Sequence, residues 1–258
     1  MIARALLVLL VASTTSCSLI TSLDDLQGTC DVDLTLVEYG FHSPGYFELQ
    51  VVDENDGLQA RAILDPPGMD HFRIHLPDAV PAGTLRLEFA GDVHGDKLID
   101  NIDDHRWTIP NACAETPHRF THVGDFTTYT ATTSLGGDFS ITLSGMKVTN
   151  QALEVQVRAI VDERGGDPIT RTVGLFRTSQ LTAADLTVTI PGIVAPGVEL
   201  LVSIWSDDNG NGLYDLPPAD ESWRKRVPAS NASAATFTYV GEFVDIGQAM
   251  VERFDPGA

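Results

Sequence analysis

Short runs in which apolar and polar residues alternate constrain the fold of this chain more than any other feature. They lie at 47–52, 72–76, 85–89, 153–157, 186–190 and 199–205. In the run LTVTI at 186–190, the aliphatic side chains would face a core and the threonines the solvent, because successive side chains of a strand point to opposite faces. Helical periodicity is nearly absent. The pattern therefore predicts an all-β fold built of half-buried strands.

The early and late runs correspond in order and spacing. The matched pairs are FELQV at 47–51 with LEVQV at 153–157, FRIHLPDAVPAG at 72–83 with LTVTIPGIVAPG at 186–197, Trp107 with Trp223, and FTHVGDF at 120–126 with FTYVGEF at 237–243. The repeat is too long for a solenoid unit, so each copy is expected to have its own core. We infer a tandem internal duplication of one β-sandwich module.

These matches define two modules, and the N-terminal sequence adds two further segments. The segments are a signal peptide at 1–16, a lipid-anchored tether at 17–29, β-sandwich modules at 30–128 and 131–247, and a C-terminal tail at 248–258. Pro81 and Gly83, and likewise Pro196 and Gly197, stand as tight turns between antiparallel strands require. The modules resemble the immunoglobulin-like or prealbumin-like modules of exported bacterial proteins, which implies antiparallel sandwiches. Periodicity leaves the choice between these two topologies open.

The first residues, MIARALLVLLVASTTSC, have the features of an export signal. Arg4 precedes an apolar run at 5–12 that is too short to span a bilayer, and small residues follow up to Cys17. The segment Thr14-Thr15-Ser16-Cys17 resembles the lipobox of bacterial lipoproteins, although Thr14 stands where that family has an aliphatic residue. The resemblance implies lipidation of Cys17, anchoring to a membrane and, with Ser18 next, sorting to the outer membrane. The alternative is an ordinary signal peptide that releases a soluble secreted protein.

The chain has three cysteines, and an odd number in an exported protein requires an explanation for the unpaired one. If Cys17 is lipidated, Cys30 and Cys113 remain as a pair in an oxidising compartment. The sequence therefore predicts a disulfide between them.

The segment SDDNGNGLYDLPPADESW at 206–223 places oxygen-bearing side chains at alternate positions, with Gly212 at position 6 of the loop. It resembles the EF-hand-like calcium loops of dockerin and thrombospondin type-3 repeats. Those loops have a carboxylate at position 12, where this chain has Pro218, so Asp220 or Glu221 would close the site. The resemblance implies a calcium site formed by Asp207, Asn209, Asn211, the Leu213 carbonyl, Asp215 and Asp220. The alternative is a hairpin turn that holds no ion.

The equivalent loop of the first module, DVHGDKLIDNIDD, is degenerate. Its candidate ligands are Asp92, His94, Asp96, Asp100 and Asp103. Lys97 replaces the glycine, and because lysine disfavours the left-handed conformation and repels a cation, we expect weak or absent calcium binding. Imidazole with carboxylates suits zinc or copper better.

All 7 histidines lie between His42 and His122, in the first module. The pairs 71/75 and 118/122 are spaced to share one face of a strand, while His94 and His105 bracket the acidic loop. Because there is no HExxH motif and no tight Cys/His cluster, exposed polar histidines are favoured over a zinc or copper site.

The net charge of −20 argues against nucleic-acid partners, and the sequence lacks nucleophile-elbow, Walker and dinucleotide motifs. We therefore expect a non-catalytic surface lipoprotein that binds no nucleotide cofactor and presents its modules to a protein or glycan partner. Trp205, Tyr214 and Trp223 would stack on a sugar or, as we favour, anchor the core. The alternatives are a structural or assembly protein that calcium only stabilises, and a hydrolase that uses loop carboxylates.

Overall fold

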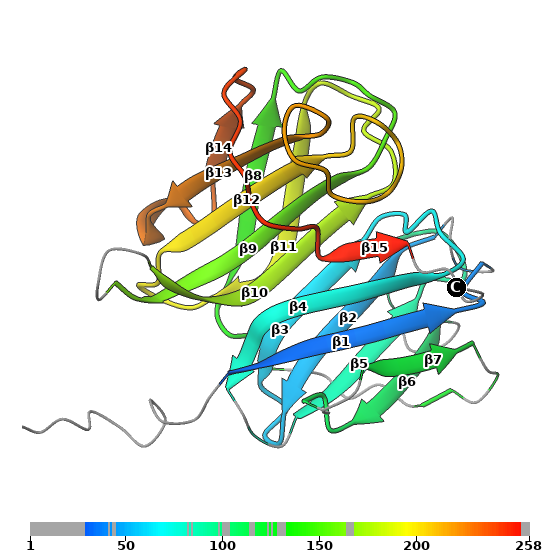
Figure 1. Cartoon of the computed structure of the whole chain (residues 1–258). Coiled ribbons are helices and arrows are strands. Elements are labelled where there is room, and N and C mark those ends of the chain that lie inside the picture. Colours follow the sequence, from blue (N-terminus) through cyan, green and yellow to red (C-terminus); the bar gives the residue numbers. More distant parts are fainter. Residues whose placement is uncertain are drawn as a thin grey trace, which may run out of the picture.

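The fold is all-β in the part of the chain that the structure, a computed structural model, describes (Figure 1). The described residues are 29–40, 42, 45–81, 83, 85–97, 99, 104–113, 117–122, 124, 126–127, 133–163 and 168–253. The predicted signal peptide, Cys17, the tether before residue 29, Asp100 and Asp103 lie outside them. Within these ranges no helix is both long and apolar enough to cross a membrane.

The first half of the fold is the lower part of Figure 1. Its strands are β1 (Thr29–Val37), β2 (Phe47–Asp53), β3 (Leu58–Leu64), β4 (Phe72–Pro81), β5 (Leu85–Gly91), β6 (His105–Pro110) and β7 (His118–Thr121). Alternation sets the two faces of these strands: in β5, for example, Leu85 and Leu87 are buried while Arg86 is partly exposed.

The second half lies above the first in Figure 1. Its strands are β8 (Gly137–Ser144), β9 (Leu153–Asp162), β10 (Ile169–Thr178), β11 (Leu186–Val194), β12 (Leu200–Ser206), β13 (Glu221–Val227) and β14 (Ala235–Thr238), with a 3-10 turn at Ala229–Asn231. The last strand, β15 (Val251–Arg253), lies in a sheet of the first half. In β11, Val188 and Ile190 are buried and Thr187 and Thr189 are exposed, as the alternation predicts.

The strand order of the first half recurs in the second. In the first, β4-β1-β7 lie in one sheet and β3-β2-β5-β6 in the other; in the second, β11-β8-β14 and β10-β9-β12-β13 have the same order. The two halves also share their pairing senses, since β7 runs parallel to β1 and β14 parallel to β8. The sandwich-like architecture is therefore as predicted, and the matching order is what a duplication would produce.

The predicted purely antiparallel pairing is wrong in three places. Besides the β1–β7 and β8–β14 pairs, β10 pairs in parallel with β3, so one sheet of each half joins into a single eight-stranded sheet. Within the predicted C-terminal tail at 248–258, residues 251–253 form β15. This strand pairs antiparallel with β4 and brings the chain back to the first half (Figure 1). Hydrophobic periodicity shows which face of a strand is buried but not which strand lies beside it.

Two main cores fill the sandwiches. In the first half, Leu34 of β1 and Ile74 of β4 belong to the same core as Leu49 of β2 and Leu87 of β5. The second half has its own core, which also takes in Leu58 and Ile63 from β3. Each half thus has a core, as expected, and β3 contributes to both.

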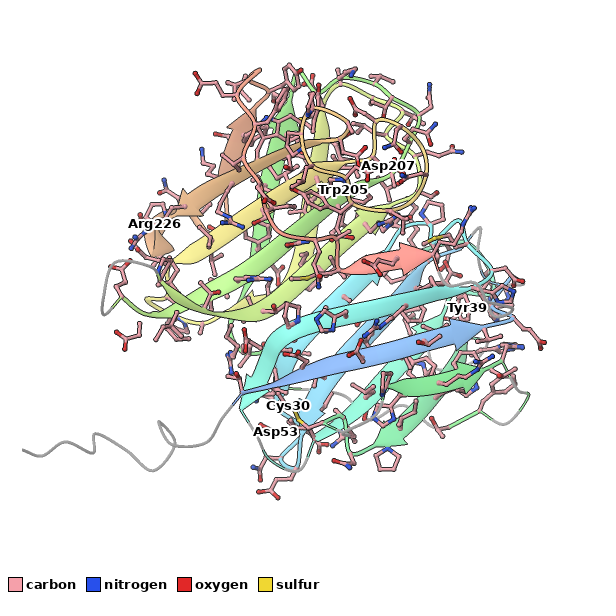
Figure 2. All side chains as sticks on the ribbon, in the orientation of Figure 1. Cys30, Tyr39, Asp53, Trp205, Asp207 and Arg226 are labelled. Atoms are coloured by element: carbon pink, nitrogen blue, oxygen red, sulfur yellow. A yellow bond between two sulfur atoms is a disulfide. The ribbon has the colours of Figure 1, made fainter. Side chains whose placement is uncertain are left out.

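The turn and disulfide chemistry is close to that predicted. Val198 donates its N–H to the Ala195 carbonyl at 3.3 Å, and Gly197 between them has a φ of 78°, which only glycine adopts without strain. Cys30 on β1 is bonded to Cys113, which follows β6, with the two Cα atoms 5.8 Å apart (Figure 2). The bond fastens the start of the first half to the loop after β6.

Candidate metal centre

The acidic loop at 207–220 connects β12 to β13, two antiparallel neighbours. Figure 1 shows it as a large excursion at one end of the second half, and Figure 2 places Asp207 and Trp205 at its base. Because the strands fix both ends of the loop, its side chains hold defined positions. Strands, rather than helices as in EF-hand loops, thus flank it on both sides.

Asp207 organises the first turns of the loop. Its carboxylate is buried, with Oδ1 accepting the N–H of Gly210 at 2.7 Å and Oδ2 that of Gly212 at 2.9 Å. Gly212 has a φ of 78°, the left-handed conformation for which glycine is suited. Burial raises the pKa of the Asp207 carboxyl, the two N–H groups oppose this shift, and the charge of Asp220 adds to it. A cation would relieve the repulsion between these carboxylates.

Asn209, Asn211 and Asp215 form the outer side of the loop. Asn209 Oδ1 accepts the N–H of Asn211 at 2.9 Å, and Asn211 Oδ1 accepts the N–H of Leu213 at 2.8 Å. The side-chain amides of both asparagines donate to Asp215 Oδ2, each at 2.7 Å. Hydrogen bonds thus link the side chains at loop positions 3, 5 and 9 into one network.

Asp220, rather than Glu221, turns into the loop. It is fully buried, and its Oδ1 accepts the N–H of Asp208 at 3.0 Å while its Oδ2 accepts the N–H of Asp215 at 2.9 Å. Trp205 Nε1 also donates to Oδ2, at 3.3 Å. Asp220 therefore fastens the end of the loop to its beginning and its middle.

Residues 92–97 of the first half form a turn like that of residues 207–212, with Gly95 and Lys97 in the left-handed conformation of Gly210 and Gly212. Asp92 Oδ1 accepts the N–H of His94 at 2.9 Å and of Gly95 at 2.6 Å, and its Oδ2 accepts the N–H of Lys97 at 2.8 Å. Lys97 has a φ of 64° and so adopts the left-handed conformation, although lysine disfavours it. Its ammonium pairs with Asp65 at 2.9 Å. Lysine therefore alters the charge of this loop without altering its shape.

Sequence reasoning missed one residue of the first loop. Asp104 Oδ1 accepts the N–H of Val93 at 3.0 Å, just as Asp220 accepts that of Asp208. Asp104 is thus the structural counterpart of Asp220, and it was not among the candidate ligands of the first loop. The signal was present, because Asp104 and Asp220 each stand three residues before the matched tryptophans. The other first-loop candidates, His94 and Asp96, have exposed side chains.

The tryptophans beside the loop are core residues. Trp205 and Trp223 are 0% and 2% exposed, so neither offers a face to a sugar ring. Trp107 contacts Phe120, His122 and Phe126 with ring centroids 5.0–5.8 Å apart. Trp223 makes the matching contacts with Phe237, Tyr239 and Phe243 at 5.6–5.8 Å. The interpretation of these residues as core anchors agrees with the structure.

Comparison with known proteins gives little further information. No protein family matches the sequence, and no curated protein matches it. Among solved structures, the chain is similar to a candidate adhesin from Bacteroides ovatus, with 11% sequence identity and a TM-score of 0.23 over 88% of this chain and 96% of that one. A TM-score this low does not indicate a shared fold and transfers no function.

Proposed function

We propose that the protein is an exported, non-catalytic pair of β-sandwiches in which the loop at 207–220 binds calcium and thereby presents a fixed surface to a partner. The observation that carries this proposal is the clustering of Asp207, Asn209, Asn211 and Asp215 around one turn, closed by Asp220. Calcium requires six to eight oxygen ligands, and carboxylate, amide and backbone oxygens are the ones it takes.

The charge of the loop supports a cation. Asp207, Asp208, Asp215 and Asp220 lie within this single connection, and Lys147 approaches one of them, with its Nζ 2.5 Å from Asp208 Oδ2. Asp207 Oδ1 and Oδ2, Asn209 Oδ1 and Asn211 Oδ1 each accept one backbone N–H and retain a second lone pair. Asp215 Oδ2 and both Asp220 oxygens already accept two donors each. Calcium would therefore bind the Asp207 and asparagine oxygens and the Leu213 carbonyl directly, and Asp215 and Asp220 would exchange a donor for the ion.

Export is supported by the Cys30–Cys113 disulfide, because such bonds persist in oxidising compartments. With both of these cysteines paired, Cys17 is the remaining candidate for a lipid anchor. Lipidation there would hold the two modules at the outer membrane. If Cys17 is not lipidated, the same modules would be secreted in soluble form.

The surface beside the loop favours a protein partner over a glycan. Leu213 and Leu216 are 46% and 61% exposed on the loop, whereas the neighbouring tryptophans are buried. An apolar surface fixed by calcium suits protein contact, since a glycan site would need an accessible aromatic face. If calcium only stabilised the fold and no partner existed, the protein would be a structural component of the envelope.

Calcium at about 100 times its dissociation constant is expected to raise the free energy of unfolding of the full-length chain by about 2.7 kcal/mol. The measurement is thermal unfolding with calcium and then with a chelator. Asp215→Asn should abolish the shift, because it removes a charge while keeping an oxygen for the asparagine amides. Asp96→Asn, in the degenerate first loop, is the matched control and should retain it.

Identical melting curves with calcium and with chelator would make the loop an ordinary turn and would remove the calcium proposal. A calcium-dependent shift accompanied by glycan-array binding would replace the protein partner by a sugar. A shift without any partner would support the structural alternative.

A further inference from the structure

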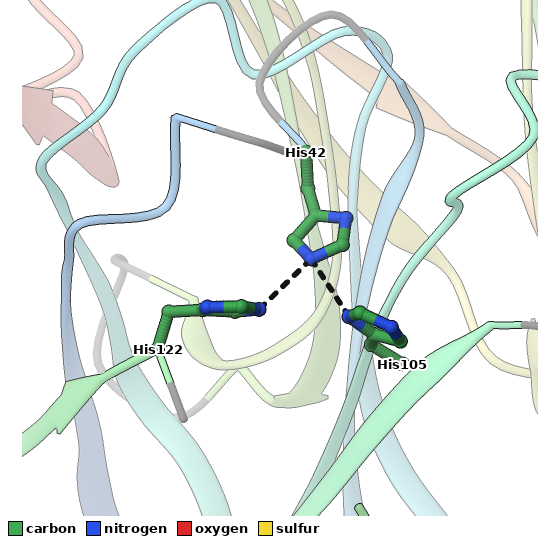
Figure 3. A group of neighbouring side chains, drawn as sticks. All are labelled: His42, His105 and His122. Carbon is green, nitrogen blue, oxygen red and sulfur yellow. Dashed lines mark hydrogen bonds between the residues drawn. The ribbon is translucent and has the colours of Figure 1, made fainter. Parts of the chain in front are cut away.

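Three histidines from separate segments meet in the first half. His42 precedes β2, His105 begins β6 and His122 follows β7. One ring nitrogen from each lies within 4.8 Å of the others, and Figure 3 shows the rings of His105 and His122 facing His42. In the sequence, His105 is grouped with His94 around the acidic loop and His122 with His118, whereas His42 belongs to neither group.

The nitrogen separations match those of ligands around one metal ion. His42 Nε2 lies 3.1 Å from His105 Nδ1 and 3.1 Å from His122 Nε2. Two imidazole nitrogens that bind a tetrahedral zinc ion at about 2.0–2.1 Å are roughly 3.3 Å apart. His42 Nε2 has either one proton or one in-plane lone pair, so it can form one good hydrogen bond but not two. A metal ion between the rings would instead bind all three nitrogens.

The surroundings of His42 and His105 favour their neutral form, which is the form that binds metal. His42 is 3% exposed, and burial, followed by the neighbouring His105 and His122, lowers its pKa to about 4. Burial and His122 also lower the pKa of His105. Neutral imidazole is the ligand for zinc, copper and similar ions.

Aromatic rings hold two of these ligands in place. Phe126 stacks on His105 with centroids 3.8 Å apart, and Trp107 contacts both His105 and His122 edge-on at 5.9 and 5.5 Å. Tyr39 lies 5.1 Å from the His42 ring on another side. A site whose ligands are fixed by packing loses little entropy when the metal binds.

The second half provides an internal comparison. The counterparts of His105 and His122 are Glu221 and Tyr239, and Tyr239 donates a hydrogen bond to Glu221 Oε1 at 3.3 Å. Lys147 Nζ lies 3.6 Å from the same oxygen, in the segment that corresponds to His42. The surrounding tryptophan and phenylalanines are alike in both halves. The same framework thus holds a lysine–glutamate–tyrosine cluster in one half and three imidazoles in the other.

We propose that His42, His105 and His122 form a binding site for one divalent transition-metal ion, for which zinc is the test ion. Three imidazoles leave one position of a tetrahedral ion open to water or to another ligand. The site is separate from the loop at 207–220 and differs from it in ligand type, since borderline ions such as zinc bind imidazole nitrogen well and calcium prefers oxygen.

The test is a calorimetric titration of zinc chloride into the chelator-treated full-length chain, with excess calcium to occupy the oxygen-rich loop. One equivalent is expected to bind. His105→Gln and His122→Gln should each weaken binding at least about 10-fold, the scale already seen when a metal site loses only an outer-shell partner. His118→Gln is the control and should leave the zinc affinity unchanged. His118 Nε2 lies 2.9 Å from the Asn111 carbonyl oxygen and is not part of the cluster.

NMR of the imidazole signals of the wild-type protein shows whether zinc binds these three histidines, even if the variants do not fold. Zinc should shift the ring signals of His42, His105 and His122 and leave those of the other histidines in place. Absence of binding, equal binding by all variants, or shifts confined to His71, His75, His94 or His118 would overturn the proposal.

Discussion

Replacing Glu154 by glutamine is expected to lower the free energy of unfolding by about 3–5 kcal/mol, the range found when one partner of a buried ion pair is removed. Glu154 is fully buried in β9, and its Oε2 lies 3.3 Å from Arg177 Nη1 on β10. Arg177 is itself 2% exposed. The substitution would therefore leave a guanidinium without its counter-ion in the protein interior.

The same carboxylate holds the C-terminal strand. Its Oε1 accepts the N–H of Met250 at 2.6 Å and its Oε2 that of Val251 at 3.2 Å, while Arg177 donates to the Val251 carbonyl at 2.7 Å. The Arg177 guanidinium also lies 5.1 Å from the Trp205 ring centroid. Loss of the pair should thus release β15 from β4 as well as destabilise the second half.

Urea unfolding gives the free energy, and hydrogen exchange at the Val251 amide reports on β15. Glu199→Gln is the control, since Glu199 pairs with Arg226 at the surface and exposed pairs contribute little. An unfolding midpoint for Glu154→Gln equal to that of Glu199→Gln would show that the buried pair has no net structural role.

Replacing both Cys30 and Cys113 by serine is expected to cost about 2–5 kcal/mol of stability. The bond spans 83 residues of sequence and constrains the unfolded chain over nearly all of the first half. Both cysteines also pack against the first core. Reduction of the wild-type protein should produce the same loss, which urea unfolding with and without reductant would measure. A midpoint that does not respond to reductant would mean that the bond is absent in the protein.

Much of the fold could be predicted from local patterns. The alternating runs became β2, β4, β5, β9, β11 and β12, and the matched tryptophans occupy matching places in the two halves. These features are local or recur at a fixed register, so a single sequence reveals them. The backbone of the loop at 207–220 was predictable for the same reason, because turns with Asp, Asn and Gly are determined by adjacent residues.

The features that escaped prediction depend on contacts between distant residues. The parallel β10–β3 pair joins two halves that the sequence presents as separate modules. Glu154 shares the polar face of β9 with Gln156, and its partner Arg177 is on another strand. The histidine cluster joins His42 to His105 and His122 over 63 and 80 residues. No spacing rule brings such residues together, since their proximity is a product of the sheet order.

The two halves therefore share a framework and differ in the chemistry at equivalent places. The loop after β12 combines Asp207, Asn209 and Gly212 where the loop after β5 has Asp92, His94 and Lys97. The position of the three imidazoles in the first half is taken by Lys147, Glu221 and Tyr239 in the second. We propose on this basis that the halves have divided cation binding, with oxygen ligands in the second and nitrogen ligands in the first.

Calorimetric titration of calcium into the chelator-treated full-length chain is the decisive experiment for the loop at 207–220. We expect a single binding site that Asp215→Asn removes and Asp96→Asn leaves intact. No heat of binding, or a heat that Asp215→Asn does not change, would contradict the calcium proposal.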